Sequence, residues 1–190
     1  MNDGRTIIIE TAFRLFLERG FEATSMNDLV KACGLSKGAL YHHFADKDAL
    51  QDATIAYFFT RFFPDQSEQG GAASAQQLLV EMGEALIALV AEVGRITPDM
   101  AAYYRFILSI LPKIRPFVRA QLADAQGRLA AAIRHEQEQG IIPMGLSPDT
   151  LAFQWLAAVE GTALLCAMTG EGDVAARIRA TIREMTLFSR

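Results

Sequence analysis

The stretch from residue 24 to residue 50, TSMNDLVKACGLSKGALYHHFADKDAL, decides the fold of the amino-terminal part of this 190-residue chain. Thr24 or Ser25 can cap a helix, because a hydroxyl oxygen accepts a hydrogen bond from the first backbone amides. The apolar residues that follow recur at intervals of three and four, the period of one buried helical face: Met26, Leu29, Val30 and Cys33. Gly34 then ends this helix, since glycine enters the left-handed conformation without steric cost.

A second, very short helix is predicted directly after this turn, over residues 37–43, with Ser36 as its cap. Helical spacing turns Leu40 and Phe44 inward. The same spacing leaves an outer face composed of Lys37, Gly38, Tyr41 and His42. Two short helices joined by a tight turn form a helix-turn-helix, whose second helix enters the major groove of duplex DNA.

Asp46 can cap a third helix, which carries Lys47 in its first turn. A lysine at a helix N-terminus gains nothing from the helix dipole, so this position favours a phosphate partner over a role in stability. The whole chain has a net charge of −4, and residues 1–50 hold six lysine or arginine residues against seven aspartate or glutamate residues. Affinity for DNA must therefore come from a few well-placed donors and not from the overall field.

The segment from residue 5 to residue 50 resembles the DNA-binding domain of the TetR family of regulators. The matching positions are Arg5, Ile8, Ala12, Phe16, Gly20, Phe21, Thr24, Gly34, Ser36, Gly38, Tyr41, His43, Phe44 and Lys47. The resemblance implies an all-α fold with an N-terminal three-helix helix-turn-helix domain, residues 1–48. A connector helix would join it to a C-terminal helical ligand-binding and dimerisation domain, residues 49–190. The function implied is that of a repressor released from DNA by a small-molecule inducer.

The motif residues have expected roles toward double-stranded DNA. Thr24, Tyr41, His43 and Lys47 are expected to hold phosphates, and Lys37 and His42 to lie nearest the bases. Ser25 and Gly38 are expected to add backbone donors.

Past residue 50 the chain keeps a helical period without the alternation of a strand. The third motif helix is expected to continue as a connector as far as Pro64. Further helices are predicted over residues 75–93, 98–111, 116–139, 148–169 and 173–189, with Thr97 and Ser147 as caps. Pro112 and Pro116 are expected to bracket a kink between the second and third of these helices.

The last two predicted helices carry wide apolar stripes interleaved with small residues, which suits helices that pack face to face. In the TetR family this pair forms a four-helix bundle with its symmetry mate, so the resemblance implies a homodimer that reads a palindromic operator. The alternative is that these stripes only close the core of a monomer.

Aromatic and sulfur-containing side chains between the connector and these helices suggest a pocket for a lipophilic small molecule. The candidate lining residues are Phe58, Phe62, Met82, Met100, Tyr103, Tyr104, Phe106, Trp155 and Glu160. Aromatic residues at helical spacing also commonly form only core. The Glu160 carboxylate could meet a ligand, although pairing with Arg177 or Arg179 is the favoured alternative.

Other classes of function are disfavoured. The two cysteines lie in separate predicted domains, and the adjacent His42 and His43 point in different directions on a helix. The sequence therefore predicts neither a metal site nor a cofactor. An enzyme is not expected, because only His135 stands out as a titratable group in the second domain. The apolar run 151–169 is interrupted by Gln154 and Glu160, so we expect a buried helix in a cytoplasmic protein and no membrane partner. A DNA-binding regulator controlled by a protein partner, or constitutively, remains an alternative.

Overall fold

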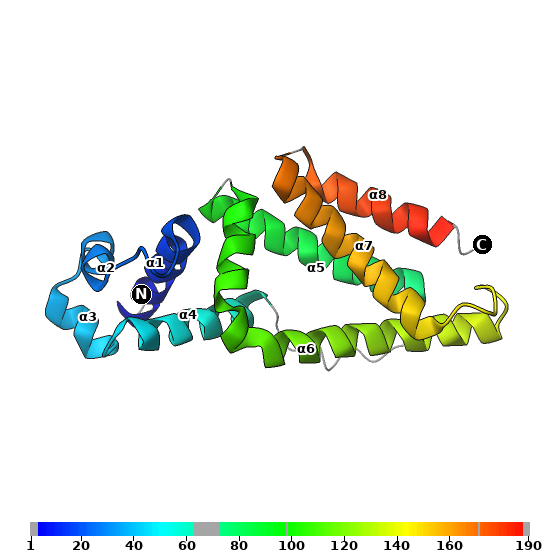
Figure 1. Cartoon of the computed structure of the whole chain (residues 1–190), viewed down its shortest axis with the longest axis horizontal. Helices are drawn as coiled ribbons and strands as arrows, with labels where there is room; N and C mark the ends of the chain where they lie inside the picture. The colour runs from blue at the N-terminus through cyan, green and yellow to red at the C-terminus, as the bar shows by residue number, and fades with distance from the viewer. Residues whose placement is uncertain (1–3, 63–72, 98, 171, 188–190) are drawn as a thin grey trace. The chain divides into compact units, whose positions relative to one another are not determined.

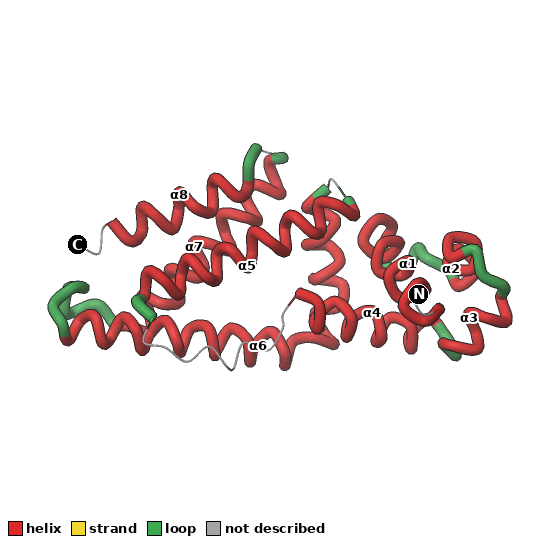
Figure 2. Tube along the Cα trace, turned by 180° about the vertical axis from the view of Figure 1, so that it is seen from behind, coloured by secondary structure: helices red, strands yellow, loops and turns green. Residues whose placement is uncertain are grey.

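The computed structural model describes residues 4–62, 73–97, 99–170 and 172–187, without the side chains of residues 61, 62 and 187. The described residues are helical and contain no strand (Figures 1 and 2). The helices are α1 Gly4–Arg19, α2 Met26–Cys33, α3 Lys37–His43, α4 Lys47–Phe62, α5 Ala75–Ile96, α6 Met100–Glu138, α7 Pro148–Thr169 and α8 Val174–Leu187. The all-α prediction is confirmed.

The chain folds as two compact units. The first spans Met1–Gln69, Ile96–Pro98 and Ala102–Ser109, and the second spans Gly70–Arg95, Asp99–Ala101 and Ile110–Arg190. The first unit thus joins the three motif helices to α4 and to a short segment of α6. Its packing extends beyond the predicted boundary at residue 48, while the functional division at that boundary stays a prediction.

The core of the first unit forms where α1 packs against α2 and α4. Its fully buried apolar side chains include Ile8, Phe16, Leu29, Leu40 and Leu50. These residues come from all four of its complete helices, so the core fixes how the helix-turn-helix is presented.

In the second unit α7 and α8 pack side by side (Figures 1 and 2). The predicted start and end of α7 are confirmed, because the Ser147 side chain caps it, Pro148 follows in the first turn, and Gly170 ends it with a φ of 68°. Helix α8 begins one residue later than predicted, and the side chain of Asp173 accepts a hydrogen bond from the Ala176 amide.

The prediction of two separate helices around Pro112 and Pro116 is wrong, because α6 continues through both residues. Proline has the helical φ, but it removes one backbone hydrogen bond and crowds the carbonyl four residues earlier, and the 39-residue helix α6 accommodates this cost at two positions. The cap of α6 is also different: Asp99, not Thr97, accepts a bond of 2.9 Å from the Ala101 amide. Helix α5 correspondingly runs on to Ile96 instead of ending near residue 93.

Helix α7 is long and apolar enough, by length and composition, to cross a membrane, which no other helix in the described ranges is. Helices that pack in the core of soluble proteins meet the same criterion, so this is weak evidence for a span. Only 28% of its apolar window is buried within this chain, which leaves an exposed apolar face to be explained.

Candidate DNA-binding surface

Helix α2 is held by hydrogen bonds between Ser25 and Asp28. The Asp28 amide donates to the Ser25 hydroxyl at 3.1 Å, and the Ser25 amide donates to the Asp28 carboxylate at 2.9 Å, which makes a reciprocal capping box. Hydrogen bonds from Ser25 also hold the pKa of the Asp28 carboxyl below its usual value. At the other end Gly34 has a φ of 66°, the left-handed conformation expected from the sequence.

Helix α3 presents one face to the core and the other to solvent. The Ser36 hydroxyl caps it by accepting a bond of 3.1 Å from the Ala39 amide. Leu40 and Phe44 are buried, as the spacing predicts. The predicted outer face, Lys37, Gly38, Tyr41 and His42, is exposed. The Lys37 ammonium lies 5.8 Å from the centre of the Tyr41 ring, so two candidate DNA-contacting groups are adjacent on this face.

Thr24 and Ser25 are placed differently from the sequence expectation. Thr24 is fully buried, and its hydroxyl donates to the Gly20 carbonyl at 2.8 Å, which closes the end of α1 instead of facing a phosphate. The backbone amide of Ser25 is exposed but already bonded to Asp28. In the free protein both groups are therefore engaged in hydrogen bonds within the motif, and their predicted contacts to DNA stay a prediction.

Lys47 has a structural role that its sequence position did not indicate. Its ammonium donates to the Phe21 carbonyl at 3.0 Å and lies 4.1 Å from the centre of the Phe21 ring. These contacts tie the first turn of α4 to the connection between α1 and α2. An ammonium has three donors, so phosphate binding is compatible with this bond.

The two histidines of α3 differ in exposure. His42 is exposed, whereas His43 is half-buried, and their rings lie 5.4 Å apart at an interplanar angle of 68°. Across the described parts of the chain there is no group of three or more histidine, cysteine or acidic residues able to hold a metal ion. The described cysteines are unpaired, and burial raises the pKa of the Cys33 thiol, which lowers its reactive thiolate fraction.

Part of the predicted ligand pocket is an aromatic cluster in the first unit. The centre of the Phe58 ring lies 6.3 Å from that of Phe106 and 6.2 Å from that of Tyr103. The Tyr104 ring meets the Tyr103 ring edge to face, with their centres 5.2 Å apart. Sequence reasoning missed the central member, Phe13 of α1, which contacts Phe58 at 5.4 Å and Phe106 at 5.7 Å. This aromatic cluster packs α1, α4 and the α6 segment together, so its members serve as core.

The other predicted pocket residues lie in the second unit or outside the described part. Met82, Met100, Trp155 and Glu160 belong to the second unit, and the side chain of Phe62 lies outside the described part. Trp155 is buried, whereas Met82 and Met100 are half-buried. A pocket lined by both groups stays a prediction.

Glu160 does not form the ion pair favoured from the sequence. The Arg179 guanidinium instead makes two hydrogen bonds to the Glu84 carboxylate, of 2.7 and 2.8 Å. The Glu160 side chain is exposed on α7, although apolar atoms close to its carboxylate partly desolvate it, and this desolvation raises its pKa above the usual value. Desolvation is the cause of the shift, and no charged neighbour among the described residues contributes to it.

Residues 8–54 match the domain described as bacterial regulatory proteins, tetR family. The chain is 43% identical over 58 residues to an uncharacterized HTH-type transcriptional regulator of Bacillus subtilis, a match that covers 30% of this chain and 20% of that protein. The chain thus spans about a fifth of that relative. It is 28% identical to an HTH-type transcriptional repressor of Mycobacterium tuberculosis, over 94% of this chain and 88% of the repressor.

The fold also matches that of AibR, crystallised in complex with isovaleryl coenzyme A and operator DNA. The TM-score is 0.60 at 23% identity, and the match covers 95% of this chain and 96% of AibR. The sequence match to the motif, the repressor aligned over most of its length and the all-helical fold agree with one another. Residues 8–54 therefore form a DNA-binding domain of the tetR family of bacterial regulatory proteins, and the chain resembles a regulator of this kind over most of its length.

Proposed function

We propose that this protein is a cytoplasmic, homodimeric transcriptional repressor that binds a palindromic operator and is released from it by a lipophilic small molecule. The observation that carries the proposal is α3, which is buried on its Leu40 side and exposed on its Lys37 side. A recognition helix needs this division, because the inner face fixes its direction while the outer face enters the major groove.

The proposed contacts follow from exposure. Lys37 and His42 lie on the open face and are assigned to base edges, while Tyr41, His43 and Lys47 are assigned to phosphates. Gly38 is exposed between them, and its lack of a side chain would let the DNA backbone approach α3 closely.

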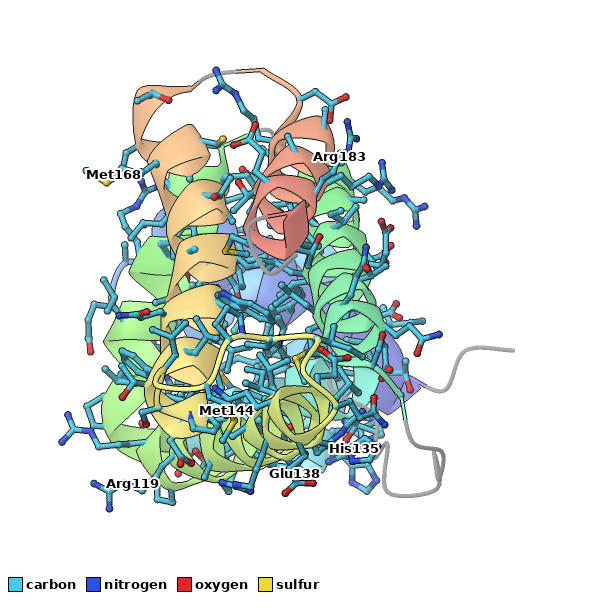
Figure 3. The ribbon with its side chains drawn as sticks, turned by 90° about the vertical axis from the view of Figure 1, so that its right-hand side faces the viewer. Arg119, His135, Glu138, Met144, Met168 and Arg183 are labelled. Carbon is cyan, nitrogen blue, oxygen red and sulfur yellow. The ribbon has the colours of Figure 1, made fainter. Side chains whose placement is uncertain are left out.

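The exposed apolar face of α7 supports the homodimer. Phe153, Leu164 and Met168 are 50%, 40% and 72% exposed, and with Ala157 they recur at helical spacing. Figure 3 shows the Met168 side chain pointing outward from the ribbon. This face is apolar except for Glu160, which is exposed on the same side of α7 between Ala157 and Leu164. An exposed, largely apolar face is typical of a protein interface. An isologous contact there would relate two recognition helices by a two-fold axis, as a palindromic operator requires.

The path of α6 supports control by a ligand. This helix contributes Phe106 to the aromatic cluster beside Phe13 of α1, and it continues without interruption into the second unit. A ligand that favours one position of α6 would therefore bias α1 and the motif. If it binds the DNA-incompetent state better, linkage requires it to weaken operator binding, typically by ~1–3 kcal/mol. AibR, with its acyl-coenzyme A and operator DNA, offers a precedent in this fold.

The first test is selection from random duplex DNA with the purified protein at about 0.15 M salt, where nonspecific contacts are weakened. Enrichment of one palindrome, bound by two chains in mass photometry, would support the proposal. Failure to enrich any sequence, with protein stripped of ligand by refolding, would contradict it.

A further inference from the structure

The first turn of α1 lies against the carboxyl-terminal end of α3. A Cβ added at Gly4, where α1 begins, would lie 3.5 Å from Nε2 of His43, which is ordinary van der Waals contact. The guanidinium carbon of Arg5 lies 5.3 Å from the centre of the ring of Phe44, the C-cap residue of α3. Both contacts place the start of α1 beside α3 (Figure 1). The surface around the proposed recognition helix therefore includes a turn that lies outside the helix-turn-helix.

Arg5 has hydrogen-bond donors that the chain does not use. Its side chain is exposed, and the guanidinium makes no ion pair or hydrogen bond to any residue in the described ranges. By contrast, Arg14 of the same helix pairs with Glu18 at 3.7 Å, and the Lys47 ammonium is bonded to the Phe21 carbonyl. A guanidinium carries five N–H donors, so Arg5 can bind an acceptor from outside the protein without breaking an internal bond.

The Phe44 ring supports the Arg5 guanidinium. Phe44 is only 4% exposed, so its ring is fixed by the core of the first unit. A cation over an aromatic face is attracted by the electron density of the ring, and an arginine held in this way keeps its N–H groups free for hydrogen bonds. Less conformational freedom is then lost when these donors bind an acceptor.

A second cation lies in a similar way at the other end of α3. Lys37, the first residue of this helix, has its ammonium 5.8 Å from the centre of the Tyr41 ring. The seven residues of α3 span roughly 10 Å at ~1.5 Å per residue. A helix in the major groove has a sugar-phosphate backbone on either side. Arg5 and Lys37, at the two ends of α3, are therefore placed to contact DNA near the edges of the groove.

The position of Arg5 beside His43 indicates which part of DNA it would contact. Residues 1–50 hold six lysine or arginine residues against seven acidic residues, so the motif depends on a few placed cations. His43 is assigned above to a phosphate, and its Nε2 atom lies next to Gly4. A phosphate bound at this nitrogen would lie beside the turn that carries Arg5.

We propose that Arg5 donates hydrogen bonds to the operator phosphate that His43 contacts, so that α1 and α3 together hold one point of the DNA backbone. This inference rests on the proposed function, because it requires α3 to lie in the major groove. It adds a contact from α1 to those assigned to the helix-turn-helix and to Lys47. The alternative is that Arg5 only covers the Phe44 ring, and the experiment separates the two.

The test is fluorescence anisotropy of the selected operator with the full chain at several salt concentrations. Arg5→Gln removes the charge but keeps an extended stem over Phe44, and Arg5→Lys keeps the charge. The matched control, Arg14→Gln, removes an exposed arginine of the same helix nine residues further on, roughly 13 Å along its axis. A thermal melt of each variant checks that it is folded.

We expect Arg5→Gln to weaken operator binding about fivefold or more, and to reduce the salt slope by about 0.9, the value for one lost phosphate contact. Arg5→Lys should keep the wild-type slope, because an ammonium also neutralises a phosphate. Arg14→Gln should resemble wild type in both affinity and slope. Wild-type affinity and slope in a folded Arg5→Gln variant would overturn the inference.

Operators that carry a single methylphosphonate locate the contact, because this group removes the charge of one phosphate. One position in each half-site should weaken wild type and Arg14→Gln but have little further effect on Arg5→Gln. His43→Ala should lose sensitivity at the same position. If Arg5→Gln were as sensitive as wild type at every position, Arg5 would only cover Phe44. If the Arg5 and His43 variants lost sensitivity at different positions, the shared phosphate would be excluded.

Failure of the proposed function gives a different result. In that case wild type would bind no selected duplex, and the Arg5 contact would be rejected with it. If wild type binds the operator and Arg5→Gln binds it equally well with the same salt slope, only the Arg5 contact is rejected.

Discussion

The Lys47 ammonium donates a hydrogen bond to the carbonyl oxygen of Phe21 and lies over the ring of the same residue. This one side chain links positions 26 residues apart, the entrance to α2 and the start of α4. A residue assigned to DNA from its sequence position is thus also part of the framework that orients the motif.

Replacing Lys47 by methionine should therefore have two effects. The stability of the protein should fall by about 1–2 kcal/mol, because a charge-assisted hydrogen bond and a cation–π contact are lost. Operator affinity should fall about equally for all sequences, and the salt slope should decrease by about 0.9 for one lost phosphate contact. Denaturant melts and anisotropy titrations at several salt concentrations measure both. Lys31→Met, on the exposed side of α2, is the control. If the Lys47→Met variant had wild-type stability and only its operator affinity were reduced, the structural role of Lys47 would be contradicted.

The start and end signals of short helices were readable from the sequence because they act within a few residues. The hydroxyl groups of Ser25 and Ser36 accept hydrogen bonds from backbone amides at the start of a helix, and Gly34 ends a helix in the left-handed conformation. All three residues act at the helix ends where the sequence predicts them. The bonds that Thr24 and Lys47 make to the carbonyl groups of Gly20 and Phe21 could not be predicted, because they depend on how the chain folds back between α1, α2 and α4. The local sequence pattern predicts which face of a helix a residue occupies, but not which distant group its side chain contacts.

The aromatic residues and the prolines show the same limit. The density of aromatic residues in the sequence indicated that Phe58, Tyr103 and Phe106 lie close together. Phe13 also contacts Phe58 and Phe106, but it belongs to a helix about 45 residues before Phe58, and helical periodicity does not predict contacts between distant helices. Pro112 and Pro116 were predicted to bracket a kink between two separate helices, whereas both lie inside the single helix α6.

Two glycines of α5 should respond oppositely to alanine. A Cβ at Gly83 would lie 2.3 Å from Cδ1 of Ile182 on α8, whereas a Cβ at Gly94 would meet nothing within 4 Å. Gly83→Ala should destabilise the protein by about 1–2 kcal/mol, because overpacking exceeds the gain in helix propensity. Gly94→Ala should stabilise it by about 0.5–1 kcal/mol. Chemical denaturation of both variants measures this, and equal shifts would show that α8 yields freely at Ile182.

Glu160→Gln should raise the melting temperature at pH 7.5. Desolvation raises the pKa of Glu160 in the folded protein above its value of about 4.3 in the unfolded chain. The charged form therefore destabilises the folded protein, and wild-type stability decreases as the pH rises from the unfolded pKa through the folded pKa. Glutamine does not titrate, so the advantage of the variant should disappear below about pH 4. Thermal melts from pH 3.5 to 8 test this, with Glu184→Gln on exposed α8 surface as control. A pH-independent difference would mean that side-chain shape, not charge, is responsible.

Gly38→Ala should separate stability from DNA binding. The nearest atom to an added Cβ is the Ser36 hydroxyl oxygen at 4.0 Å, so the free protein has room for a methyl group. Alanine should stabilise the short helix α3 by up to about 1 kcal/mol, because it has the higher helix propensity. The same methyl group would stand on the outer face beside Lys37, where the DNA backbone is proposed to approach.

Operator affinity of the Gly38→Ala variant should consequently fall by about tenfold or more, while its melting temperature rises. Anisotropy titration with the selected operator and a thermal melt provide the two readings. Ala39→Gly, one residue further along and half-buried, is the matched control: it should lower the melting temperature, and its affinity should change only as far as folding does. If Gly38→Ala bound the operator as tightly as wild type, the start of α3 would not approach the DNA backbone, and the orientation proposed for this helix in the groove would have to be abandoned.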